Sequence, residues 1–335
     1  MVKFIFTGDW HIRGTNPRNR IDDYKEAAKT KLREVFTLAE RHGVTAIIVP
    51  GDIFDRPEVS IAVLLEFVKV LKESPVPIYT TPGNHDIYGY NVETYWRSSL
   101  KLLDMLVPQL TVVTDSKDVQ IFTDGIRTAV EVTFAPYSSA MDINGYGYSP
   151  EYNDGTTPIE KYSKGYKIHV AHGMLLDHEP PFDRYTLVNK VETTADMVLT
   201  GHCHTGYGIY TRKDGKRFCN PGALLRIAAS TTEIERPVQV ALITVDKCEG
   251  NIELLRLECA KPGDEVLDRS KIEAEKQRQY SMEQFSALIQ SKTGEKVLLD
   301  VNQIIETIAN QEMYSPEVVK TALETIDLQR EKVKT

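Results

Sequence analysis

The chain has 335 residues, of which 41% are hydrophobic and 26% are charged, and its formal net charge is −8 at pH 7. This composition is that of a globular protein whose length allows one large core or two smaller ones. The net charge argues against a protein whose whole surface binds nucleic acid, although local basic patches remain compatible with it. No apolar run approaches the roughly 18 residues of a membrane span. The N-terminal run reads as a strand rather than an export signal, and scattered cysteines predict reduced thiols in the cytoplasm.

The first 80 residues alternate between predicted strands and helices. Strands are expected at 3–8, 44–50 and 76–81, and helices at 22–42 and 59–73. This order indicates βαβ units and a largely parallel sheet. From about residue 111 the chain changes to short strands, at 111–113, 119–122, 126–134, 166–171, 196–200, 207–211, 236–245 and 251–258. We interpret these as the antiparallel part of a second sheet and predict an α/β, four-layer sandwich of two sheets with helices outside.

Two further regions break this pattern. Residues 138–158 form a long loop rich in Gly, Ser, Asn and Tyr, and loops of that length are usually functional or disordered. The sequence K-P-G-D-E at 261–265 marks a boundary, which predicts a core domain at 1–262 and a helical region at 263–335. Helices are expected there at 269–291, 297–311 and 316–332, the last with proline at its first position.

Five predicted strands end in a glycine beside side chains that can bind metal. These ends are Gly8-Asp9-Trp10-His11, Gly51-Asp52-Ile53-Phe54-Asp55, Gly83-Asn84-His85-Asp86, His172-Gly173 and Gly201-His202-Cys203-His204. In α/β sheets, sites form at the carboxyl ends of strands. Oxygen and nitrogen ligands without thiolate suit Mn²⁺, with Fe²⁺ or Zn²⁺ possible. Two aspartates, one asparagine oxygen and four histidines make seven candidate ligands, which are enough for two ions that share a carboxylate.

The ordered series D-x-H, G-D-x-x-D, G-N-H-D, H-G and G-H-x-H resembles that of the calcineurin-like metallophosphoesterases, over about residues 1–260. The resemblance implies two divalent ions, with Mn²⁺ expected. One ion would be held by Asp9, His11, Asp52 and His204. The other would be held by Asp52, Asn84, His172 and His202. The resemblance also implies that His85 faces the scissile phosphate and assists the leaving oxygen, and that Asp55 orients His85.

Within that superfamily, several motifs are similar to those of the SbcD-type DNA exonucleases, which include phage recombination nucleases. The motifs are G-D-W-H, G-D-I-F-D, G-N-H-D, G-H-C-H-T-G and Asn220-Pro221-Gly222-Ala223. This similarity implies hydrolysis of DNA in double-strand-break repair, recombination or replication. It also implies a homodimer and an SbcC-like coiled-coil ABC-type ATPase partner, on which the C-terminal helices would dock, and no membrane. The family's DNA-capping domain usually follows the core. Few residues follow the core here, so the sequence does not decide whether a full capping domain is present.

The DNA contacts and the substrate are less well determined by the residues. The loop Arg13–Arg20 contains Arg13, Arg18 and Arg20, has no acid, and directly follows two expected metal ligands. Tyr146 and Tyr148 are candidates for stacking on bases, although a surface loop with tyrosines explains them equally well. The site alone does not select the substrate, so a phosphoprotein or a cyclic nucleotide remains the alternative. A non-catalytic scaffold is disfavoured by the intact ligand set and His85.

Overall fold

The computed structural model divides the chain into two compact units, Met1–Asp268 and Arg269–Thr335. It describes residues 1–150, 165–270, 273, 277–280, 282 and 321. In the second unit, the described residues from Ser270 onward have helical backbone. Most of the helices expected after 262, and the end of the loop expected at 138–158, lie outside the described residues. The domain division at 262/263 therefore stays a prediction.

The first sheet has six strands in the order β14-β13-β1-β2-β3-β4. Their bounds are Val2–Phe6 (β1), Ala46–Val49 (β2), Ile78–Thr80 (β3), Leu110–Val112 (β4), Gln239–Asp246 (β13) and Glu249–Arg256 (β14). Strands β1 to β4 pair in parallel, whereas β13 is antiparallel to both β1 and β14. All four residues of β2 are buried, as expected of a parallel strand covered on both faces.

The second sheet also has six strands, in the order β11-β12-β10-β7-β6-β5. Their bounds are Gln120–Thr123 (β5), Ala129–Ala135 (β6), Tyr166–Ala171 (β7), Met197–Thr200 (β10), Gly208–Thr211 (β11) and Arg217–Asn220 (β12). The four inner strands are parallel, and only the edge strands β5 and β11 are antiparallel to their neighbours. A separate pair is formed by β8 (Leu175–Leu176) and β9 (Thr186–Leu187).

These pairings correct the expected second sheet. The late strands do not form one antiparallel unit, because β4, β13 and β14 join the first sheet and the inner strands of the second are parallel. Apolar patterning reports which residues are buried in a strand but not which strand lies beside it. The mixed α/β class, with two packed sheets flanked by helices, is confirmed.

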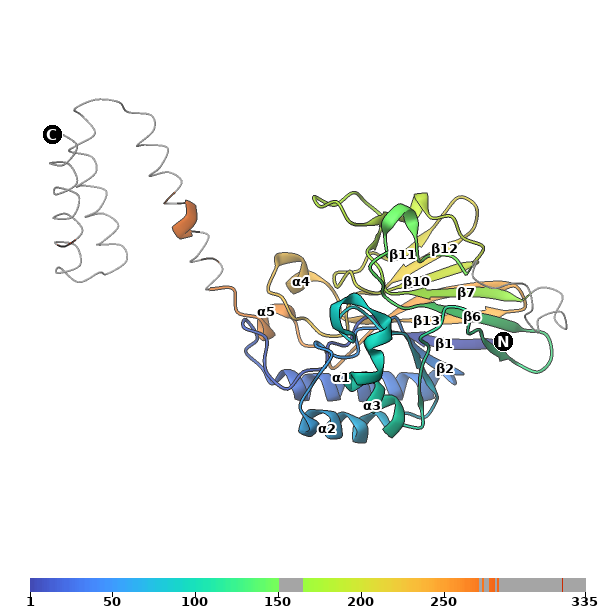
Figure 1. Cartoon of the computed structure of the whole chain (residues 1–335), viewed down its shortest axis with the longest axis horizontal. Coiled ribbons are helices and arrows are strands. Elements are labelled where there is room, and N and C mark those ends of the chain that lie inside the picture. Colours follow the sequence, from blue (N-terminus) through green and yellow to red (C-terminus); the bar gives the residue numbers. More distant parts are fainter. Residues whose placement is uncertain (151–164, 271–272, 274–276, 281, 283–320, 322–335) are drawn as a thin grey trace, which may run out of the picture. The chain divides into compact units, whose positions relative to one another are not determined.

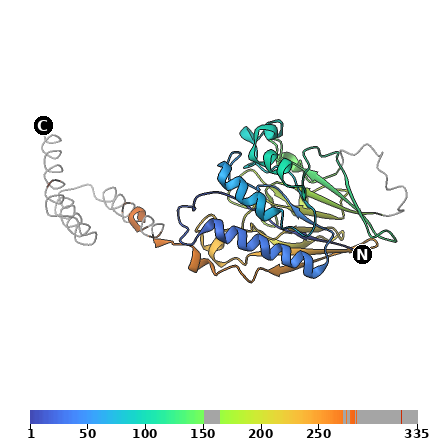
Figure 2. The ribbon, with the colours of Figure 1, turned by 90° about the horizontal axis from the view of Figure 1, so that it is seen from below.

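Three helices cover the outer face of the first sheet: α1 (Tyr24–His42), α2 (Ile61–Leu71) and α3 (Ser99–Leu106) (Figures 1 and 2). Helix α1 begins where the Asp23 side chain accepts a hydrogen bond from the Glu26 N–H, and it ends at Gly43, whose φ of 58° is left-handed. The shorter helices are η1 (Tyr88–Tyr90), η2 (Val92–Arg97), η3 (Ile143–Gly145), η5 (Val188–Lys190), α4 (Thr231–Glu235) and α5 (Gly263–Val266).

The core lies in three layers that follow from the alternation of side chains along the strands. In β1, Ile5 packs against the helices, whereas Phe4 and Phe6 pack between the two sheets. Phe134 reaches the same inter-sheet layer from β6. A third cluster packs strand residues of the second sheet, such as Val198 and Phe218, against Tyr148 and the η5 residue Val188. Among the described residues, no helix is long and apolar enough to cross a membrane.

Candidate metal centre

The seven expected ligands lie together where strands of both sheets end. The imidazole or carboxylate atoms of Asp9, His11, Asp52 and His204 form one group in which all lie within 4.8 Å of one another. Asp52, His172 and His202 form a second group by the same measure. The side-chain oxygen of Asn84 lies 3.0 Å from Nε2 of His172. The arrangement therefore has the shared Asp52 that the sequence suggested, and the ligand roles stay predictions.

Three of these residues have an unusual backbone conformation. The φ angles of His11, Asp52 and His202 are 46°, 50° and 65°, in the left-handed region that residues other than glycine rarely adopt. Such conformations cost free energy and concentrate at functional sites. The tight turns after the strands thus direct these side chains into the centre.

Neighbouring glycines provide the space that the carboxylates occupy. A Cβ atom on Gly83 would lie 2.1 Å from Oδ1 of Asp52, and one on Gly201 would lie 2.2 Å from Oδ1 of Asp9. Both distances are far shorter than a van der Waals contact. Any larger residue at either glycine would therefore displace a carboxylate of the centre.

Main-chain N–H groups hold the carboxylates in place. The His202 N–H donates to both oxygens of Asp9, at 2.9 and 3.2 Å, and the His85 N–H donates to Oδ1 of Asp52 at 2.8 Å. In turn, the carbonyl oxygen of Asp52 accepts hydrogen bonds from the N–H groups of Trp10 and His11. The loops after β1, β2, β3 and β10 therefore fix one another.

One buried oxygen has no hydrogen bond to satisfy it. Oδ2 of Asp52 accepts none from the described residues, although Nε2 of His172 lies 3.2 Å away and Nε2 of His11 lies 3.6 Å away. Nε2 of His11 also lies 2.9 Å from Nε2 of His204. Buried polar atoms are normally paired, and a carboxylate oxygen among ring nitrogens suits a cation. The residues present therefore fit a divalent metal centre.

The centre contains strongly perturbed acids and bases. The pKa of Asp9 is raised to about 7. Burial is the main cause, His172 opposes it, and the charge of Asp52 adds to it. Burial also opposes ionisation of Asp52, but His172 and His11 hold its pKa below the usual range. Burial opposes the charged form of His172, yet Asp52 raises its pKa to about 9. Burial lowers the pKa of His202 to about 3 and of His204 to about 4, so both imidazoles are neutral at pH 7.

His85 lies at the border of the centre. Its Nδ1 is 2.8 Å from the main-chain oxygen of Asp55, and its ring lies edge-on to that of His11, with centroids 4.8 Å apart. The resemblance implied that Asp55 orients His85, and this role stays a prediction; in the structure the contact of His85 is with the Asp55 carbonyl. The Asp55 carboxylate instead pairs with Nη1 of Arg13 at 3.0 Å.

Two residues near the centre were given no role from the sequence. Asp86 is buried and accepts hydrogen bonds from the N–H groups of Ile53, Phe54 and Gly83, which ties the second loop to the third. Its place in G-N-H-D was the available signal. Tyr137 follows β6 outside any motif, and its ring centroid lies 5.6 Å from that of His202.

The structure separates the candidate DNA contacts. Arg13 lies beside the centre through its ion pair with Asp55, and Arg18 and Tyr146 are exposed. Arg20 and Tyr148 are buried, which corrects their assignment as DNA contacts. The Arg20 guanidinium bonds to the Asp22 carboxylate, and the Tyr148 hydroxyl donates to the Asp142 carboxylate. Both side chains are therefore used inside the protein.

Comparison with known proteins shows the family of this chain. The family model described as calcineurin-like phosphoesterase matches residues 2–206. The chain belongs to this family. A DNA double-strand break repair protein Mre11 from Aeropyrum pernix is 21% identical over 215 residues, which cover 61% of this chain and 49% of that protein. The chain thus matches about half the length of this curated relative.

Solved structures with a similar fold include phosphoesterases. A dimetal phosphatase from Danio rerio is 14% identical, with a TM-score of 0.43, over 76% of this chain and 95% of that one. Yfce, a phosphoesterase from E. coli, is 12% identical, with a TM-score of 0.35, over 72% of this chain and 88% of that one.

The raised pKa values of Asp9 and His172 predict that metal binding releases protons. A metal ion binds the deprotonated groups, so affinity should rise with pH as each group loses its proton. At pH 6 both groups carry a proton in the metal-free protein, so Mn²⁺ should release about two protons, and at pH 8 about one, from His172. Calorimetric titration in buffers of different ionisation enthalpy measures this number. A release of no protons at pH 6 would contradict the assignment.

Proposed function

We propose that this chain is a metal-dependent DNA nuclease that hydrolyses phosphodiester bonds and acts in the cytoplasm. Membership of the calcineurin-like phosphoesterase family supports a phosphoester hydrolase. The observation that carries the proposal is the convergence of seven oxygen and nitrogen donors, with His85 beside them, at one edge of two sheets. DNA as the substrate is supported by the similarity to a protein named for double-strand break repair, and by Arg13 at the border of the centre.

The proposed centre takes two divalent ions, with Mn²⁺ the expected metal. The groups that would hold them are Asp9, His11, Asp52, Asn84, His172, His202 and His204. Divalent ions there supply Lewis-acid polarisation of a phosphoryl group and lower the pKa of a water. The protein itself contributes fixed ligand positions, since main-chain N–H groups orient both carboxylates. Nδ1 of His172 bonds to the Pro50 carbonyl at 3.1 Å, which leaves its Nε2 as the ligand atom.

The position of His85 allows its ring to donate or accept a proton. Because the Asp55 carbonyl can only accept a hydrogen bond, Nδ1 of His85 carries the hydrogen and Nε2 is left to give or take a proton. As the general acid, Nε2–H would protonate the oxygen that leaves phosphorus, which prevents an alkoxide from forming. Arg13 forms an ion pair with the Asp55 carboxylate, and the Asp55 carbonyl contacts His85. Arg13 therefore helps to fix the position of His85 through Asp55.

The substrate proposal is tested with purified full-length protein and Mn²⁺ on four substrates. These are end-labelled duplex DNA, single-stranded DNA, a phosphopeptide and a cyclic nucleotide. DNA should be cleaved at a rate well above the other two, and Asp52→Ala should abolish cleavage because it removes the shared carboxylate. Hydrolysis of the phosphopeptide or the cyclic nucleotide without cleavage of DNA would show that the chain is a phosphoesterase of another specificity.

Substitution of His85 separates chemistry from metal binding. His85→Asn should lower the rate of DNA cleavage by about 10²–10⁴-fold, the usual contribution of general acid catalysis. The variant should keep the metal content of the wild type, measured by elemental analysis. His178→Asn is the matched control, because His178 is exposed in a loop and should leave the rate unchanged. Loss of metal from His85→Asn would make His85 a ligand instead.

We also propose that two copies of the chain associate through α2, η2 and α3. Helices α2 and α3 pack together, and the exposed apolar side chains of this region are Ile61, Leu65, Trp96, Leu102, Met105 and Leu106. Exposed apolar side chains gathered on neighbouring helices favour an interaction site. A two-fold axis would set this surface against itself, so each copy covers the other. We propose separately that the chain binds an SbcC-like ABC-type ATPase through its C-terminal region, residues 263–335, and pull-down with the full chain measures this binding.

The dimer is tested by sedimentation velocity. Wild-type protein should sediment as a dimer, and Met105→Glu should sediment as a monomer because a carboxylate would be buried in the interface. Ile126→Glu is the control, since Ile126 is equally exposed in the turn between β5 and β6 and should leave the dimer intact. A wild-type monomer at tens of micromolar, a concentration where a stable dimer forms, contradicts the proposal.

A further inference from the structure

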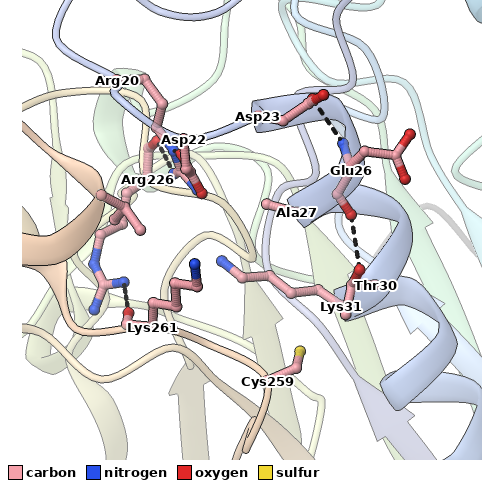
Figure 3. A pocket seen from close by; sticks show the side chains of 11 residues that line it. Arg20, Asp22, Asp23, Glu26, Ala27, Thr30, Lys31, Arg226, Cys259 and Lys261 are labelled. Carbon is pink, nitrogen blue, oxygen red and sulfur yellow. Dashed lines mark hydrogen bonds and ion pairs between the residues drawn. The ribbon is translucent and has the colours of Figure 1, made fainter.

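A pocket lined by several charged side chains lies away from the metal ligands, beside the start of α1. Its volume is about 250 Å³, far more than the roughly 30 Å³ that one water occupies in the liquid. It lies between α1, the segment around Arg226 and the chain from Cys259 to Val266 (Figure 3). We call it the cationic pocket, because Arg20, Lys31, Arg226 and Lys261 line it.

The deep part of the cationic pocket is positively charged. Arg20, Lys31 and Arg226 are 7%, 4% and 4% exposed, so their charges are largely removed from water. Asp22 neutralises Arg20, with Nη2 of Arg20 3.0 Å from Oδ2 of Asp22. Among the described residues, no carboxylate lies within ion-pair distance of Lys31 or Arg226. Buried charges are normally paired, so an excess of this kind favours a bound anion.

The other acids at the cationic pocket already have partners. The Asp23 carboxylate caps α1 by accepting from the Glu26 N–H at 3.0 Å, and the Glu26 carboxylate is 2.8 Å from Nζ of Lys29. Glu233, which lies near Arg226, pairs with Arg236. Glu233 and Asp264 act on Arg226 only from a distance, so among the described residues neither Lys31 nor Arg226 forms an ion pair with a carboxylate.

The hydrogen bonds of the two buried cations leave donors for a ligand. Arg226 donates to the main-chain oxygens of Glu233, Lys261 and Arg236, which fixes its side chain but does not neutralise it. Nζ of Lys31 donates to the Leu224 oxygen at 2.9 Å, and its protonated form has two further hydrogens to donate. Figure 3 shows the side chains of Lys31 and Lys261 extending toward one another into the same space. Burial, together with Arg20 and Arg226, lowers the pKa of Lys31 to about 7.

We propose that the cationic pocket binds a phosphate-type oxyanion, either free phosphate or the phosphate of a small phosphomonoester. Nζ of Lys31 and Nζ of Lys261 would donate to its oxygens from two sides, and the fixed charge of Arg226 would favour a dianion. The cationic pocket is connected to the metal centre by hydrogen bonds through one residue, Leu224. Lys31 holds the Leu224 oxygen, and the Leu224 N–H donates to the main-chain oxygen of Asp9 at 2.8 Å.

The test is calorimetric titration of the full, metal-free chain with inorganic phosphate at constant ionic strength. Phosphate should bind saturably at one site, and Lys31→Met should weaken binding by at least about tenfold, because a charged hydrogen bond is lost. Lys25→Met is the matched control on the same helix. Lys25 pairs with Glu66 outside the pocket and should leave affinity unchanged. Unchanged affinity in Lys31→Met, or no saturable binding at about 10 mM phosphate, would overturn the proposal.

Two further arms complete the experiment. A nucleoside 5′-monophosphate replaces phosphate in the same titration. Competition between the two shows that the site takes phosphomonoesters, and binding of phosphate alone shows that it takes the free anion. Lys261→Glu reverses an exposed charge with little risk to folding, so it serves if Lys31→Met does not fold. It should weaken phosphate binding, and unchanged affinity there would also overturn the proposal.

Discussion

Two carboxylates, Asp9 and Asp52, are buried close together in one small volume, and the arrangement of the whole site follows from this constraint. Unpaired buried charges are costly, and like charges side by side add to the cost. The protein offsets this by directing main-chain N–H groups at both carboxylates and by surrounding them with imidazoles. Part of the cost remains, as the raised pKa of Asp9 shows. A divalent cation would remove this remaining electrostatic cost, so its removal would contribute to the free energy of metal binding.

The same constraint explains the backbone around the centre. Side chains from five strand ends have to converge, so the chain turns sharply after each strand, and three ligand residues take left-handed conformations. Glycines stand where any Cβ would meet a carboxylate. The sheets tolerate these costs because their strands are packed in three apolar layers, which hold the strand ends in position. The edge that holds the candidate metal centre is thus stabilised by residues that never contact it.

The α/β class and the two packed sheets could be predicted from the sequence, whereas the neighbours of several strands could not, and the roles of the site residues stay predictions. The candidate ligands could be proposed because they gather in short motifs that contain a glycine at the end of an apolar run. Strand neighbours could not, because the pattern of β13 is the same whichever sheet it joins. Arg20 and Tyr148 show a second limit, since a loop residue can fold inward onto a partner such as Asp22 or Asp142 that no local spacing reveals. Tyr137 shows a third, because packing against His202 requires only proximity.

The division of the ligands between two sheets has a consequence for how the protein is made. Asp9, His11, Asp52 and Asn84 come from the first sheet, whereas His172, His202 and His204 come from the second. A ribosome therefore releases four of the seven groups long before the others, and β1 still lacks its neighbour β13 when His204 emerges. The nascent chain has no complete metal centre until most of the core has been synthesised. A metal ion held by all seven groups would therefore bind late in biogenesis, and its binding would report that both sheets have assembled correctly.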